Sequence, residues 1–179
     1  MRRRAVLRRG RRKTVCARGA SLAALAGRSS LPLDRQGWRI RAVPREPWGE
    51  LFDLVTAVLL SDAAGDTERF AKAFTALRAL YARQKALEKP DPALTEALAD
   101  YTDEAAEAVA LYRVAIAQSA SYPDEPTHTK RICLASRLID LGDFAEARSE
   151  LALGRADAAR LKDAKYVKLA DKLLSKLAI

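Results

Sequence analysis

The only histidine of the chain, His128, is the side chain best suited to act as a base near neutral pH. It follows two prolines and stands at the start of a predicted helix, and no nucleophile-elbow motif accompanies it. A lone histidine in such a place typically caps the helix or lies at the surface. We therefore predict no Ser–His–acid or Cys–His catalytic site, and we expect a protein that is not an enzyme.

Carboxylates are the other side chains that could transfer protons here, and they form two clusters. Because these acids stand at predicted helix starts and turns, we expect them to cap helices and to complement helix dipoles. The first cluster contains Asp100, Asp103, Glu104 and Glu107, and the second contains Asp124 and Glu125.

The residue counts argue against the common metal and phosphate sites. One histidine and two cysteines, Cys16 and Cys133, are too few for a zinc site or a disulfide framework. The stretch 19–30 contains glycines but lacks the Lys-Ser/Thr ending of a phosphate-binding loop. We expect no metal, no cofactor, and reduced thiols in a cytoplasmic protein.

The net charge of +9 belongs to one end of the chain. Residues 1–47 contain 14 Lys+Arg and two acids, a net of +12, whereas residues 48–179 contain 18 bases and 21 acids, a net of −3. The first 33 residues contain ten Lys+Arg and no acid. We therefore divide the chain into a basic, disordered leader, residues 1–46, and a folded domain, residues 47–179.

The leader allows several interpretations. Arg- and Ser-rich, acid-poor segments are typical of organellar transit peptides, which would give an organellar location instead of a cytoplasmic one. A secretory or twin-arginine signal fits less well, because the apolar stretch 20–27 is short. The arginines would also suit an arm that binds nucleic acid through phosphates. The remaining interpretation is a non-native extension from a start codon assigned too early.

Apolar residues at spacings of three and four predict a succession of helices after the leader. Short connections between them favour an all-α fold of antiparallel hairpins. The longest apolar stretch, 51–60, has about half the length of a bilayer span, so we expect no membrane span. The predicted helices cover 48–61, 67–89, 93–101, a segment capped by Asp103, 127–141, 144–160 and 163–178. In the last helix, one face carries the bases Lys165, Lys168, Lys172 and Lys176, which we interpret as a solvated face.

An internal repeat relates two of these helices. Small, large and small residues recur 39 residues apart at matching positions: Ala108, Tyr112 and Ala115, then Ala147, Leu151 and Gly154. These spacings of four and three place each set on one helix face. Small residues there let a neighbouring helix approach closely. A period near 40 residues that contains a helix–turn–helix unit is typical of a helical solenoid.

The stretch 111–151 resembles the tetratricopeptide repeat family, and 134–148 (LASRLIDLGDFAEAR) most closely. In that stretch Ala135 stands in the first helix, Gly142 at the turn and Ala147 in the second helix. The spacing is similar to the longer, roughly 40-residue variants of the family. The resemblance implies a right-handed stack of helical hairpins and a concave face lined by the first helix of each hairpin.

On the best repeat, the resemblance implies that the concave face contains the candidate partner-binding residues Thr129, Ile132, Ser136, Ile139 and Asp140. We therefore predict a protein–protein interaction module, such as an adaptor, an assembly factor or a neutralising partner of another protein. The alternative is a nucleic-acid-associated protein that uses the Arg-rich leader for phosphate contacts. An enzyme of an α-helical class ranks last.

Overall fold

The computed structural model describes residues 46–177, and the leader up to residue 45 lies outside the described part. Within residues 46–177 the chain forms helices and no strand, which confirms the all-α prediction. The helices are α2 (Glu46–Ala64), α3 (Thr67–Gln84), α4 (Pro92–Tyr101), α5 (Ala105–Ser119), α6 (His128–Leu141), α7 (Phe144–Arg160) and α8 (Ala164–Lys176).

Local sequence explains most of the helix ends. Asp66 caps α3 by accepting a hydrogen bond from the backbone of Arg69 at 3.0 Å. Asp91 caps α4, and Pro92 occupies the first turn, where a missing N–H costs nothing. Helix α6 ends at Gly142, whose φ of 86° lies in the left-handed region that glycine adopts without strain.

Two predicted helix ends are wrong. Helix α3 ends at Gln84 and does not continue to Lys89. The segment that follows α3 is tied instead to a later loop, because the Tyr122 hydroxyl donates to the Lys89 carbonyl at 2.9 Å. The residue at the N-cap of α5 is Glu104 rather than Asp103, and its side chain makes no capping hydrogen bond.

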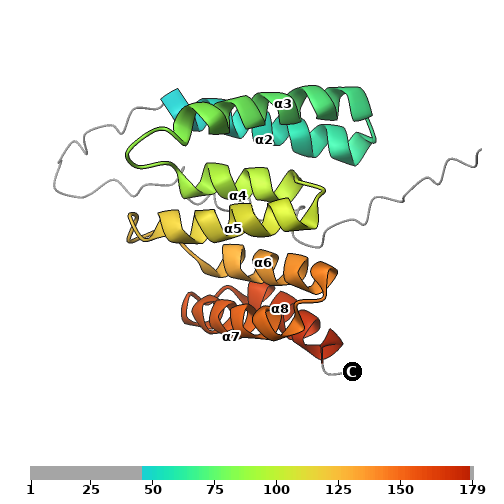
Figure 1. Cartoon of the computed structure of the whole chain (residues 1–179), viewed down its shortest axis with the longest axis vertical. Helices are drawn as coiled ribbons and strands as arrows, with labels where there is room; N and C mark the ends of the chain where they lie inside the picture. The colour runs from blue at the N-terminus through green and yellow to red at the C-terminus, as the bar shows by residue number, and fades with distance from the viewer. Residues whose placement is uncertain (1–45, 178–179) are drawn as a thin grey trace, which may run out of the picture.

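Helices that follow one another in the sequence pack against one another, so the described part forms a stack in chain order (Figure 1). The hairpins α2–α3, α4–α5 and α6–α7 have extensive packing between their two helices, and α8 packs on both α7 and α6. The packing between α3 and α4 is the thinnest between consecutive helices of this part. This order confirms stacked hairpins, whereas the right-handed solenoid remains a prediction.

The apolar core runs through the whole stack. Leu77 of α3, Leu134 of α6 and Leu151 of α7 are at most 1% exposed. Helix α8 closes the stack with Tyr166, Ala170 and Leu173, and the predicted basic face of this helix is exposed. Helices α2–α8 lack the length and hydropathy that a membrane crossing requires.

Candidate functional site

The predicted repeat-packing residues lie between helices, except Gly142, which is exposed at the end of α6. The six small and large positions on α5 and α7 are buried, as is Ala135 on α6. Gly154 shows why the position must be small, because an added Cβ would stand 2.8 Å from Cγ1 of Ile132. The same Cβ would stand 3.2 Å from the His128 carbonyl oxygen. Helices α6 and α7 therefore approach as closely as a glycine allows.

The repeat extends to an ion pair that the sequence analysis missed. Glu107 of α5 accepts from Arg78 of α3 at 2.9 Å, and Glu146 of α7 accepts from Arg113 of α5 at 2.7 Å. The two glutamates are 39 residues apart and each is the third residue of its helix. The pairs are exposed, so each contributes little to stability. The 39-residue spacing of the two glutamates, which is also the spacing of the packing residues, would have identified these ion pairs from the sequence.

The five candidate partner-binding residues on α6 do not form one open surface. Thr129 and Ser136 are 6% and 8% exposed, whereas Ile139 is half-buried and Asp140 is exposed. Ile132 is fully buried and contacts the position of Gly154 in α7. Ile132 is therefore an interhelical packing residue and does not line the inner side of the stack, because the helical register turns it toward α7.

A buried charge cluster links α6 to α4 and was absent from the sequence predictions. The side chain of Lys130 is fully buried, and its Nζ lies 2.6 Å from Oε1 of Glu125 and 3.1 Å from Oε2 of Glu96. Nζ also donates to the Pro126 carbonyl at 3.0 Å. One ammonium therefore lies between two carboxylates of the described residues.

Glu96 is the incompletely paired member of this cluster. It is 1% exposed, and neither of its carboxylate oxygens has a hydrogen bond of good geometry with a described residue. A buried carboxylate without hydrogen bonds is costly, because water no longer solvates its charge. The signal that would have found it is the pair Glu96 and Asp100, which lie one turn apart on an otherwise apolar helix.

Helices α4 and α6 run parallel and in register. Lys130 reaches Glu96, and Arg137, two turns later on α6, donates to the Thr102 carbonyl just beyond α4 at 2.8 Å. Equivalent faces of the two helices therefore lie on the same side of the stack. We call this side the α4–α6 face and define it by helical spacing as Ala93, Glu96, Ala97 and Asp100 on α4, and Thr129, Cys133, Ser136 and Asp140 on α6.

The acids predicted to cap helices have other roles at this face. Asp100 accepts a hydrogen bond from the Tyr112 hydroxyl of α5 at 2.5 Å, and Glu125 pairs with Lys130. Burial raises the pKa of the neighbouring Tyr101 hydroxyl above its usual range, and the charges of Asp100 and Asp62 raise this pKa further. Negative charge therefore gathers around the end of α4.

His128 differs from the prediction of a capping or surface residue, because it is 4% exposed. Its Nε2 lies 3.2 Å from Oδ2 of Asp163, and its ring packs edge-on against Tyr166 at a centroid distance of 5.4 Å. Asp163 also accepts from the backbone of Tyr166 and so caps α8. The histidine thus helps to fix α8 against α6.

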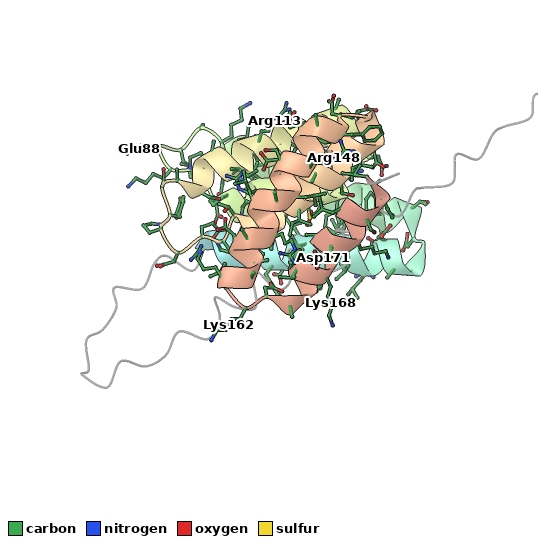
Figure 2. All side chains as sticks on the ribbon, turned by 90° about the horizontal axis from the view of Figure 1, so that it is seen from below. Glu88, Arg113, Arg148, Lys162, Lys168 and Asp171 are labelled. Carbon is green, nitrogen blue, oxygen red and sulfur yellow. The ribbon has the colours of Figure 1, made fainter. Side chains whose placement is uncertain are left out.

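The exposed bases of the described part are spread over the molecule. Figure 2 shows Lys162 and Lys168 at one edge of the view and Arg113 at the opposite edge. In residues 46–177, no group of three or more His, Cys, Asp or Glu side chains is arranged to hold a metal ion. No family model, curated protein or solved structure matches this chain.

Proposed function

We propose that this protein is a non-catalytic protein-binding module whose α4–α6 face holds a polypeptide segment that carries a guanidinium or ammonium group. The observation that carries the proposal is Glu96, a buried carboxylate in a cluster where one lysine faces two glutamates. A cation brought by a partner would complete the hydrogen bonds of this carboxylate.

The residue types of the α4–α6 face support a polypeptide as the ligand. Its central residues Ala93, Ala97, Cys133 and Ser136 have short side chains. The acids Glu96 and Asp100 flank this strip on α4, and Asp140 lies at the exposed end of α6. Short side chains bordered by acids fit a ligand that combines small residues with bases. The resemblance to tetratricopeptide repeats implies the same side of the stack.

The alternative of a nucleic-acid-associated protein draws on the leader alone, which lies outside the described residues. The charge of residues 48–179 is −3, and these residues would repel a phosphate backbone. The described part therefore favours a protein partner.

Affinity capture with the full-length chain tests the proposal when it is combined with a charge reversal at the exposed end of the face. We expect Asp140→Lys to reduce the yield of directly cross-linked partner proteins by about tenfold, since a like charge replaces an attractive one at the interface. Asp171→Lys is the matched control, because Asp171 is an exposed acid on α8 (Figure 2).

Two results would count against the proposal. One is an equal yield from wild type and Asp140→Lys, which would place the binding surface elsewhere. The other is the loss of every captured protein after nuclease treatment, which would favour the nucleic-acid alternative.

A further inference from the structure

The first and last helices of the described stack carry opposite charges. Helix α2 contains four acids and no base between Glu46 and Ala64. Helix α8 contains four lysines, all on its exposed face, and one acid, Asp171. Figure 1 places α2 and α8 at opposite ends of the stack, and Figure 2 looks onto the end formed by α7 and α8, where Lys168 is labelled. One end of the described part is therefore acidic along its helix and the other end is basic.

Helix α2 also leaves large apolar side chains uncovered. Phe52 is 45% exposed and Leu60 is 54% exposed, whereas Leu51, Val55 and Val58 are buried. The helical register places the two exposed residues on the side of α2 opposite to the buried ones. A terminal helix of a stack of hairpins is expected to have a polar outer face, as α8 has. Contact with water alone therefore explains the outer face of α8 but not that of α2.

The charged side chains of the two helices have matching spacings. Glu50 and Asp53 are exposed and three residues apart on α2, and Lys168 and Lys172 are exposed and four residues apart on α8. Both spacings correspond to one helical turn, or about 5–6 Å between Cβ atoms. The aliphatic parts of lysine side chains can cover apolar surface while their ammonium groups reach carboxylates. The exposed face of α8 can thus satisfy both the acids and the apolar side chains of α2.

We propose that the exposed face of α8 in one molecule packs on the exposed face of α2 in a second copy, so that the stacks associate head to tail. The contact is intermolecular, because α3 to α7 separate the two helices within one molecule. It uses different surfaces of the two copies, so each added copy leaves one α2 and one α8 open for further growth. This inference goes beyond the proposed function, which concerns the α4–α6 face.

The size of the contact sets its strength. Helix α8 has 13 residues, so it is about 20 Å long and about 10 Å wide. Its footprint of about 200 Å² is small beside the roughly 800 Å² per partner of a stable complex. We therefore expect weak association with a Kd of about 0.1–1 mM. The charges are exposed, so salt should weaken the contact further.

Sedimentation velocity of the full-length chain tests the proposal. Over about 10 µM to 1 mM protein at about 0.05 M salt, the average mass should rise at least about twofold. At about 0.5 M salt the rise should be much smaller. A monomer over the whole range of concentration at low salt would overturn the inference, and so would association that salt does not change.

Two variants block one end each. Lys168→Gln with Lys172→Gln removes the lysines of α8 and should weaken association about tenfold, since two exposed ion pairs are lost. Asp53→Lys with Leu60→Lys places like charges against α8 and should weaken it at least as much. A mixture of the two variants should form dimers that do not grow, because one intact α8 meets one intact α2 and the other two ends are blocked. A symmetric contact between two α2 helices would instead leave the α8 variant associating like the wild type, which would overturn the inference.

The connection between α3 and α4 supplies matched controls. It lies at the side of the stack (Figure 1), and its side chains from 85 to 89 are exposed. Leu87→Lys with Glu88→Lys matches the α2 variant, and Lys85→Gln with Lys89→Gln matches the α8 variant. Both controls should associate like the wild type, and circular dichroism verifies that all four variants are folded. Equal weakening by variants and controls would refute a contact between α2 and α8.

Disulfide cross-linking provides a test that does not depend on removing charge. In a Cys16→Ser background, Asp53→Cys and Lys172→Cys place one new thiol on α2 or on α8, while Cys133 is only 1% exposed. Under mild oxidation a mixture of the two variants should yield mixed dimers above the proportion that random pairing gives. A random proportion, or an excess of dimers between identical variants, would contradict head-to-tail packing.

Discussion

The close approach of α6 and α7 at Gly154 makes a specific prediction about stability. In Gly154→Ala the new Cβ would stand 2.8 Å from Cγ1 of Ile132, whereas carbon atoms in ordinary contact lie about 3.5–4.0 Å apart. Ile132 is fully buried, and the backbone oxygen of His128 blocks another direction at 3.2 Å. Overpacking of this kind costs about 1–3 kcal/mol. Alanine recovers about 1 kcal/mol through its higher helix propensity.

Subtracting the gain in helix propensity from the cost of overpacking leaves a loss of about 0–2 kcal/mol. We therefore expect Gly154→Ala to lower the free energy of unfolding by about 1 kcal/mol, the middle of this range. Urea denaturation followed by circular dichroism measures it as a drop in the midpoint of about 0.3–1 M, since the slope for a domain of this size is about 1–3 kcal/mol/M. Gly49→Ala in α2 is the matched control, because no atom lies within 4 Å of its added Cβ. This control should be neutral or stabilising.

A double substitution identifies the cause of the loss. Ile132→Ala removes the atom that the new Cβ meets, so the combined variant should be more stable than the sum of the two single effects predicts, by about 1 kcal/mol. If Gly154→Ala is as stable as Gly49→Ala, close approach at the repeat positions is not what selects the small residue, and the packing argument for the repeat fails.

Three further predictions concern single side chains. Lys130→Met should destabilise the protein by about 3–5 kcal/mol in urea denaturation, because it removes the ammonium that Glu96 and Glu125 face. Glu96→Gln should cost clearly less, because the carboxylate of Glu96 is incompletely paired, and equal losses from the two variants would contradict this incomplete pairing. The raised pKa of Tyr101 means that the folded state keeps this proton above pH 10 while the unfolded state releases it, so stability should fall as pH rises above about 10. Tyr101→Phe should reduce that fall by up to about 1.4 kcal/mol per pH unit between pH 10 and 11, and an unchanged slope would refute the assignment. Gly142→Ala should cost about 1 kcal/mol, because its φ of 86° is strained for any residue with a Cβ, and a neutral thermal unfolding curve would contradict this.

The helices were predictable because their causes are local. Apolar spacing, Asp66, Pro92 and Gly142 mark starts and ends that depend on neighbouring residues only. The end of α3 was not predictable in this way, because the segment after Gln84 is held by Tyr122, which is more than 30 residues away in the sequence. The helix propensity of neighbouring residues cannot predict such a tertiary contact.

The candidate site was predictable only in part for the same reason. Periodicity placed small residues such as Gly154 at helix contacts, because burial follows the helical repeat. The pairing of Lys130 with Glu96 depends on the parallel register of α4 and α6, which no single helix encodes. Similarly, the burial of His128 depends on α8 folding back onto α6, so its position at a helix start suggested a surface residue instead.

The thin packing between α3 and α4 has a consequence for how the molecule opens. In a stack where each hairpin contacts its neighbours in sequence, free energy is shared only across adjacent interfaces, and the weakest interface separates two cooperative units. The hairpin α2–α3 can therefore unfold while α4–α8 remain intact. Its amide protons should exchange with deuterium sooner than those of α5 and α6, and the leader is tethered to this less protected unit.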